Sequence, residues 1–224
     1  MGNGLNFILL AATAYWVFVS VMVVLSVRKM SHPEPLLEAV EDEARLNDIQ
    51  GISNWAGEQG FVLDKQFDFR GMVGNDLRMA VDAWASLDRK LFFMHYAFKD
   101  KHWYEFVSNL DEKYSLTSSS FKDSLTLPFP PRALVQVFEG MPPGELLEQH
   151  NKTLRFFKEQ FEVEPAIADK PMYNLLVDAI KDQMQHVKSL PFWYLKGAWW
   201  YFYRRNRLKN RSIIDLIQTT NRDQ

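Results

Sequence analysis

The sequence predicts an α+β protein in which an N-terminal transmembrane helix precedes an antiparallel β-meander domain flanked by helices. Three observations support this fold class: a long uncharged apolar run at the start, alternating segments joined by short turns in the middle, and helical periodicity towards the end. The 224 residues are 47% hydrophobic and 24% charged, which is typical of a globular protein with one sizeable core. We expect an anchor over residues 1–30, a linker and amphipathic helix over 31–60, a sheet over 61–140 and C-terminal helices over 141–224, with 61–224 forming one domain.

The first segment, residues 5–27 (LNFILLAATAYWVFVSVMVVLSV), contains no charged side chain. As a helix it would be roughly 34 Å long, compared with about 30 Å for the apolar core of a bilayer. A cleaved signal peptide would begin with basic residues and would have a shorter apolar run that ends in small residues. This chain instead begins MGNGLN, and Arg28 and Lys29 follow its long apolar run. The pattern therefore favours a retained single-pass anchor.

The distribution of basic residues predicts the orientation of this anchor. Arg28, Lys29 and a basic C-terminal region all follow the apolar run, and no basic residue precedes it. Because basic residues are enriched on the cytoplasmic side, we expect the N-terminus outside and the domain on the cytoplasmic side of the cell (inner) membrane. The net charge of −2 argues against nucleic acid as a partner, and the absence of cysteine excludes disulfides and thiolate metal sites.

Four side chains inside the apolar run are candidates for helix packing: Thr13, Tyr15, Trp16 and Ser20. Tyr15 and Trp16 lie near the middle of the run rather than at the headgroups, where such rings usually collect. Thr13 and Ser20 share a helix face and could form hydrogen bonds to another helix. Two interpretations remain open at this stage: the span packs against other transmembrane helices, or it is a lone anchor whose polar groups bond its own backbone.

Alternation of polar and apolar residues predicts the sheet. In FVLDKQFDFR, residues 61–70, the pattern places Phe61 and Phe67 on one buried face and Asp64 and Asp68 on the opposite, solvated face. Further strands are expected over residues 78–85, 91–98, 102–110, 113–120 and 133–138. Turns such as residues 86–88 and 99–101 are too short for crossover helices, so the strands that they join should be antiparallel.

Helices are expected before and after the sheet. An amphipathic helix should follow the acidic linker and end near Gly57. After residues 142–144 (PPG), apolar residues at spacings of three and four predict a helix with this stripe: Leu147, His150, Leu154, Phe157 and Phe161. A second helix should begin at Pro171 and end before Pro191, and a third should carry the C-terminal aromatic and basic residues.

The third helix contains the most unusual composition in the chain, KGAWWYFYRRNRLKNR over residues 196–211. Residues 183–214 carry seven Lys or Arg and no Asp or Glu, so the rest of the chain sums to −9 (−2 minus +7). Aromatic rings favour the headgroup layer, and basic side chains favour an anionic leaflet. The sequence therefore predicts an interfacial helix that meets the lipid bilayer, although a core helix and a protein-binding helix remain alternatives. The predicted membrane-interface residues are Trp193, Trp199, Trp200, Phe202, Arg204, Arg205 and Arg207.

Catalytic and metal-binding motifs are absent from the sequence, which has no nucleophile elbow, P-loop, dinucleotide fingerprint or zinc-protease motif. No two histidines have helical metal-ligand spacing, and a hairpin turning at Asp100 would place His95 opposite Glu105 rather than near His102. We expect His150, inside an apolar stripe, to be a core histidine. The sequence thus supports no catalytic residue, no cofactor and no metal.

The segment LTSSSFKDSLTLPFPP, residues 116–131, resembles a stretch of uncharacterised bacterial single-pass membrane-anchored proteins. The C-terminal end, in which residues 196–198 (KGA) lead into aromatic and basic residues, is similar to them too. The resemblance covers the domain from Trp55 onward. It implies the anchored architecture and no activity.

These observations predict a non-catalytic single-pass membrane protein whose cytoplasmic domain is an accessory or structural subunit of a larger membrane protein complex. Its expected partners are the lipid bilayer and other membrane protein subunits. Two alternatives remain open: a membrane-tethered module that binds a lipid or small ligand on its sheet, and an enzyme whose site matches no known motif.

Overall fold

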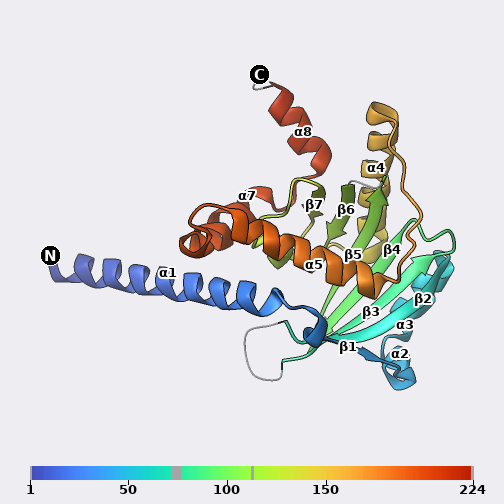
Figure 1. The fold of residues 1–224 in the computed structure, drawn as a ribbon, viewed down its shortest axis with the longest axis horizontal. Coiled ribbons are helices and arrows are strands. Elements are labelled where there is room, and N and C mark those ends of the chain that lie inside the picture. Colours follow the sequence, from blue (N-terminus) through green and yellow to red (C-terminus); the bar gives the residue numbers. More distant parts are fainter. Residues whose placement is uncertain (1, 72–76, 112–113, 223–224) are drawn as a thin grey trace.

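The computed structural model describes residues 2–71, 77–111 and 114–222, and it confirms the α+β fold (Figure 1). A long helix, α1 (Gly2–Met30), projects from a domain that is built on one sheet. The short helix η1 (Glu34–Leu36) leads from α1 into that sheet. The apolar N-terminal helix and the sheet domain are thus both present and adjacent, as the sequence predicts.

The strands of the described residues form a seven-stranded sheet in which they follow one another in chain order. Their bounds are β1 Leu37–Val40, β2 Phe61–Phe69, β3 Met79–Ser86, β4 Phe92–Phe98, β5 Lys101–Leu110, β6 Tyr114–Ser119 and β7 Ala133–Val137. Neighbours from β1 to β6 pair antiparallel, whereas β6 and β7 pair parallel. The parallel pair is joined by a long connection through η2 (Lys122–Leu125) and a proline-rich loop, which lets the chain return before β7 begins.

Helices cover both faces of the sheet (Figure 1). One face is packed by α5 (Met172–Ser189) and the other by α3 (Gln50–Glu58) and α4 (Pro143–Phe161). Because both faces are covered, consecutive residues on a central strand are buried on opposite sides, as Phe92 and Phe93 are. The sheet is therefore the middle layer of three.

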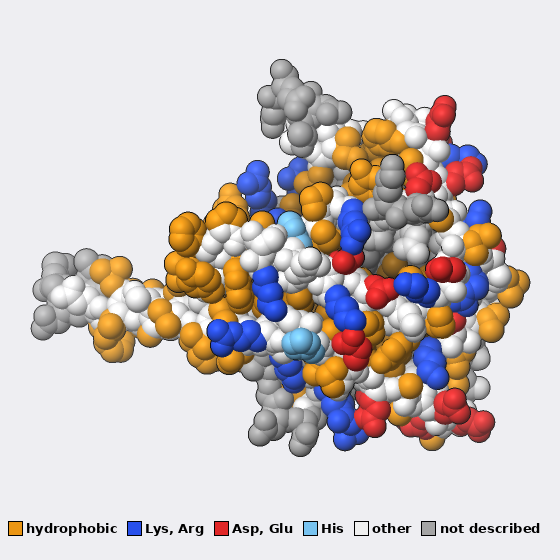
Figure 2. Space-filling view, viewed as in Figure 1, with side chains coloured by type: hydrophobic (Ala, Val, Ile, Leu, Met, Phe, Trp, Pro, Cys, Tyr) orange, Lys and Arg blue, Asp and Glu red, His pale blue; other side chains and the backbone are white. Residues whose placement is uncertain are grey.

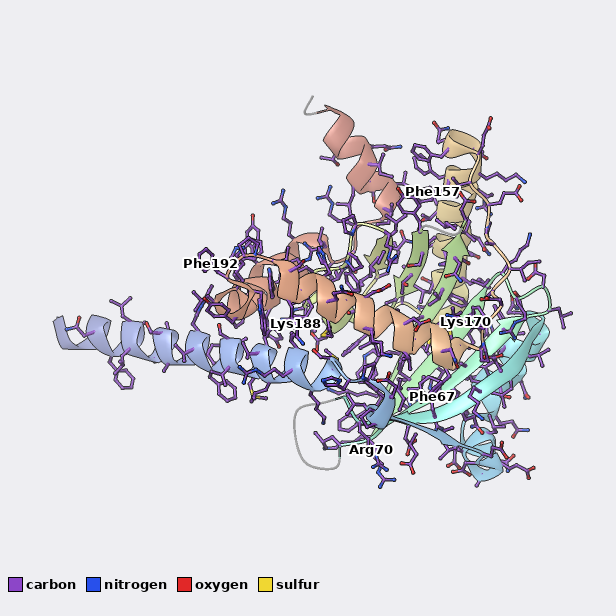
Figure 3. The ribbon with its side chains drawn as sticks, in the orientation of Figure 1. Phe67, Arg70, Phe157, Lys170, Lys188 and Phe192 are labelled. Atoms are coloured by element: carbon purple, nitrogen blue, oxygen red, sulfur yellow. The ribbon has the colours of Figure 1, made fainter. Side chains whose placement is uncertain are left out.

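A β-bulge in β2 changes the expected facing of that strand. The pairing register with β3 shifts between Leu63 and Lys65. As a result Phe61 packs with α3 and α4, whereas Phe67 is buried beneath α5 (Figure 3). The prediction that the two phenylalanines share a face is wrong, because one extra residue reverses the direction of every side chain that follows it.

The same bulge separates the two aspartates that were expected on one solvated face. Asp64 turns towards α5, where its Oδ2 accepts a hydrogen bond from the backbone N–H of Met172 (2.8 Å) and its Oδ1 pairs with Arg89 (2.9 Å). Asp68 lies on the other side and pairs with Arg45 (3.1 Å). That prediction is also wrong. Asp64 instead caps the first turn of α5 from across the domain.

Several elements depart from the sequence-based boundaries. Strand β1 lies in residues that were expected to be a linker, and the predicted amphipathic helix is interrupted at Ile49. The expected third C-terminal helix is broken into short pieces, and α8 was not anticipated. The part of the amphipathic helix before Ile49 is α2 (Glu43–Asp48). The C-terminal helices are η3 (Trp193–Leu195), α6 (Gly197–Trp199), the π-helical η4 (Trp200–Arg204), α7 (Arg205–Leu208) and α8 (Ile213–Arg222).

Candidate membrane interface

Helix α1 is, among the described residues, the one helix that is long and apolar enough to cross a membrane, over Asn6–Met30. Its most apolar stretch is only 11% buried, and its N-terminal half projects free of the domain (Figure 1). Burying apolar surface is favourable by about 25 cal/mol per Å², so this surface favours an apolar environment outside the chain. Its exposed large side chains include Phe7, Ile8, Leu9, Leu10, Val17 and Phe18.

The C-terminal half of α1 is part of the protein core. Val19, Val23 and Val27 recur every four residues and are all buried, which places them on one side of the helix. Val23 and Val27 pack with Met184 and Val187 of α5. The helix is thus divided into a free half and a half that the domain covers.

We call residues 192–208 the aromatic segment, and they make the closest contact with α1. A Cβ atom on Gly197 would lie 2.8 Å from Val23 Cβ and 3.1 Å from Ser20 Cα, so only glycine allows this approach without a shift. The backbone N–H of Ala198 donates a hydrogen bond to Ser20 Oγ (3.3 Å). Such close contact through small residues is typical of helix packing in membranes.

The four candidate packing residues of α1 have separate roles in the structure. Ser20 does bond another helix, but that helix belongs to the same chain. The ring of Tyr15 lies 5.7 Å from that of Phe202, again within the chain. Thr13 donates to its own helix backbone, at Leu9 O (2.9 Å), and Trp16 is exposed.

The aromatic segment sorts its rings into inner and outer sets. Helices α6, η4 and α7 follow one another without a break, and the wider π turn of η4 rotates the side chains that flank it. Trp200 is only 2% exposed, whereas its neighbour Trp199 faces outward and stacks on Tyr203 at 5.2 Å. Trp200 packs with Trp193 in the cluster that holds α1. The prediction that Trp200 meets lipid is wrong, because the protein core encloses its ring.

The outer rings form one apolar surface at the base of the free half of α1. Phe192 is 64% exposed, and Figure 3 places it at the edge of the domain nearest the free end of α1. Leu195, Trp199 and Tyr203 are exposed as well. In Figure 2, hydrophobic side chains gather along α1 and on the domain edge beside it. The exposed apolar side chains of α1 and of the aromatic segment thus lie beside one another on the surface.

The three predicted interface arginines have different surroundings. Arg205 turns towards the domain, where it pairs with Asp123 (2.6 Å) and lies over the ring of Tyr201 (4.0 Å). Arg207 extends along Tyr203, with its guanidinium carbon 5.9 Å from the ring centroid. Arg204 forms no ion pair among the described residues. Arg205 therefore stabilises the fold, and only the other two remain available to a membrane.

Apart from the membrane-facing region, a row of polar side chains lies on the sheet face that carries α3. It runs from the buried Asp82 through His95 to His102. Asp82 pairs with Arg45 (3.0 Å) and accepts a hydrogen bond from Gln66 (2.9 Å). Its other oxygen meets His95 Nδ1 (3.2 Å), and His95 Nε2 lies 2.9 Å from His102 Nδ1. When each imidazole donates from Nδ1, the lone pair of His102 Nε2 has no hydrogen-bond partner among the described residues.

This chain of imidazoles corrects the expected register of the hairpin. His95 pairs with Tyr104 across the strands, not with Glu105, because the turn is centred between Lys99 and Asp100 rather than on Asp100. The shift by one residue brings His95 and His102 to the same face. Burial, followed by the charge of His95, lowers the pKa of His102 from its ordinary value. The pair lies on the sheet face opposite α5.

His150 is a core histidine, as its place in an apolar stripe predicts. Its Nε2 lies 3.1 Å from Ser108 Oγ and its Nδ1 lies 2.9 Å from Ser118 Oγ. Burial lowers the pKa of His150 to about 3, so its imidazole is neutral at neutral pH. Ser118 is also fully buried, and Gln136 donates to it (2.8 Å). These contacts hold α4 on the sheet.

Within residues 2–71, 77–111 and 114–222, no group of three or more His, Cys, Asp or Glu is arranged to hold a metal ion. Comparison of the chain with protein-family models, with curated proteins and with solved structures found no match. Functional inference therefore depends on the surface around α1 and on the chemistry of the side chains that compose it.

Proposed function

We propose that this protein is a single-pass membrane protein whose domain is held against the bilayer by the aromatic segment and serves as an accessory subunit of a membrane complex. The observation that supports it most strongly is the position at which the aromatic segment meets α1. Phe202 contacts Tyr15, and helix α1 before Tyr15 is only about 20 Å long. The apolar core of a bilayer is about 30 Å thick.

These two lengths determine what the aromatic segment must do if α1 crosses a membrane. The bilayer has to extend past Tyr15 by on the order of 10 Å, so the near leaflet surrounds the aromatic segment as well. Phe202 contacts Tyr15 and Ala198 bonds Ser20, so the aromatic segment lies along this stretch of α1, and its rings of Phe192, Trp199 and Tyr203 are exposed. Tyrosine and tryptophan favour the boundary between hydrocarbon and headgroups, which accounts for their exposure here.

The packing of Gly197 against α1 supports an anchor that is retained rather than cleaved. Removal of α1 would expose Met184, Val187 and Trp200, which are at most 2% exposed in the intact chain. A signal peptide is removed from the mature protein, so a core that includes it would be lost. Orientation remains as the basic residues indicate, with the domain in the cytoplasm.

The exposed side of α1 supports the proposal that partner subunits bind there. Trp16 is 44% exposed in the middle of the helix, on a level where tryptophan is unusual among lipid-facing residues. A neighbouring transmembrane helix would cover it. The alternative function, binding of a lipid or small ligand, is favoured by a basic groove beside the aromatic segment, which is described below.

Single-cysteine labelling tests this proposal, because the natural chain has no cysteine to interfere. The variants are Asn3→Cys, Leu87→Cys and Trp199→Cys, each expressed in intact cells and treated with a membrane-impermeant maleimide. Asn3→Cys should react from outside. Leu87→Cys, on an exposed turn of the sheet (83% exposed), should react only after permeabilisation. Trp199→Cys should react much more slowly than Leu87→Cys even then, because lipid shields it.

Each alternative has its own outcome in this experiment. Labelling of Leu87→Cys without permeabilisation would show that the domain lies outside the cell, opposite to the proposed orientation. Equal rates for Leu87→Cys and Trp199→Cys in permeabilised cells would show that the aromatic segment faces water, and release of the protein by alkaline carbonate would show that α1 is no anchor.

A further inference from the structure

A groove of about 300 Å³ lies between the end of the aromatic segment and α8. Among the described residues, its lining contains three arginines and no acidic side chain. The residues that matter for its chemistry are Trp199, Tyr203, Arg204, Arg207, Arg211 and Thr219. The groove is thus basic on one side and aromatic on the other.

The fold holds two of the arginines in place. Arg211 pairs with Val137 of β7 through an isolated backbone bridge, so its position is tied to the sheet. Its guanidinium donates to Thr219 Oγ1 on α8 (3.1 Å). Arg207 lies against the ring of Tyr203, one helical turn earlier. The two charges are therefore ordered by neutral neighbours, which leaves their attraction for an anion intact.

Arg204 is the third arginine of the groove, and no carboxylate among the described residues pairs with it. Its Nε is buried and has no hydrogen-bond partner among the described residues. Burial lowers the pKa of this guanidinium from its ordinary value. A buried charged donor without a partner is costly, so the guanidinium of Arg204 gains from an acceptor placed beside it.

Two carboxylates in the described part of the chain lie near the groove, and both are engaged elsewhere. Asp215 on α8 accepts hydrogen bonds from the backbone N–H (3.1 Å) and the hydroxyl (2.7 Å) of Ser212. Those bonds are the largest cause that lowers the pKa of Asp215, with Lys152 and Arg211 as weaker contributors. Asp123 pairs with Arg205 on the domain side of the helix. Neither carboxylate lines the groove.

We propose that the groove binds the phosphate of an anionic lipid headgroup. The proposal rests on the membrane function proposed above, because the groove must lie at the bilayer surface. Guanidinium groups match phosphate geometry and form two hydrogen bonds to it at once. Trp199 and Tyr203 line the groove and also belong to the exposed apolar surface beside α1. A ligand with a phosphate and acyl chains uses both sides, whereas free phosphate uses only the basic one.

Binding to the full-length protein in neutral detergent micelles tests the proposal. Isothermal titration calorimetry would compare dioleoyl phosphatidic acid, dioleoyl phosphatidylcholine and inorganic phosphate. The groove variant is Arg207→Gln with Arg211→Gln, and the matched control is Arg132→Gln with Arg155→Gln, which changes the net charge equally on exposed parts of the domain. We expect the groove variant to weaken phosphatidic acid binding roughly tenfold or more, and the control to weaken it less than about twofold.

A third variant, Arg204→Lys, keeps the charge but removes the buried Nε. It should weaken binding measurably while the melting temperature stays near that of the natural protein, which shows that the fold is intact. Equal losses in the two double variants would overturn the proposal in favour of net charge alone. Inorganic phosphate that binds as tightly as phosphatidic acid would overturn the lipid as the ligand.

Membrane integration distinguishes this inference from the proposed function. All variants should remain in the membrane after alkaline carbonate extraction, because α1 is unchanged. A groove variant that is integrated and binds phosphatidic acid normally would overturn the groove while the membrane function stands. Extraction of the natural protein by carbonate would overturn the membrane function itself.

Discussion

Two regions of this protein are rich in aromatic residues, and the structure treats them differently. In the sheet, the rings of Trp84 and Phe106 stack on Phe93 at 5.2 and 5.1 Å, and all three are buried. In the aromatic segment, Trp199 and Tyr203 stack at a similar distance, 5.2 Å, yet both are exposed. The first cluster finds its partners within the chain. The second cluster has no protein neighbour on its outer side among the described residues, and a bilayer would cover that side.

The largest expected effect separates these regions by stability. Phe93→Ala should lower the free energy of unfolding by about 3–5 kcal/mol, because it leaves a cavity among packed rings. Trp199→Ala removes a larger ring but should change that free energy by less than about 0.5 kcal/mol, as is usual for exposed sites. Denaturant unfolding of the full-length protein in micelles, followed by circular dichroism, measures both.

Membrane affinity should respond in the opposite order. Trp199→Ala should weaken association of the domain with the bilayer, seen as faster maleimide labelling at a neighbouring cysteine placed at Tyr203. A loss of 3 kcal/mol or more from Trp199→Ala would show that this ring belongs to the core and that the comparison between the two regions fails.

An intermediate effect comes from pH, through the fully buried His150, whose ring lies 6.1 Å from Phe106. Its folded pKa of about 3 lies below the ordinary value of 6.5, so the unfolded chain binds more protons between these values. Stability is therefore complete above pH 6.5 and is lost as the pH falls towards 3. Between pH 7 and pH 5 the free energy of unfolding should fall by about 2 kcal/mol from this residue alone.

A His150→Gln variant isolates this contribution, since it cannot titrate in that range. His102, whose pKa is also lowered, contributes with the same sign in both proteins. Unfolding curves at pH 7 and pH 5 should therefore differ less for the variant. The same pH dependence in both proteins would mean that His150 is not buried as a neutral imidazole.

An effect of similar size is expected at the contact between α1 and the aromatic segment. Gly197→Ala should destabilise the protein by about 1–3 kcal/mol or displace the aromatic segment, because its Cβ would overlap Val23. Gly57→Ala is the matched control, since a Cβ there meets nothing within 4 Å and should be neutral or stabilising. If both variants melt at the same temperature, α1 does not pack on the aromatic segment as the structure shows.

Local patterns predicted the elements that depend on local physics. Alternation and short turns located β2 to β5 within one or two residues and made them antiparallel, since a short turn permits no other pairing. The exact register of the strands was less predictable than their positions. The hairpin register that joins His95 to His102 depended on one residue of turn length, and the bulge that divides Asp64 from Asp68 has no glycine to reveal it.

For the candidate site, the sequence by itself determined that a long apolar helix exists and that aromatic and basic residues lie together near the C-terminus. Composition and length decide these properties, because they need no knowledge of distant contacts. Tertiary structure decided the rest: Trp200 turns inward while Trp199 turns outward, Arg205 pairs with Asp123, and Arg204 lines a groove beside α8. Those outcomes depend on which side chains and helices surround each residue in the folded protein, and these neighbours lie far away in the sequence.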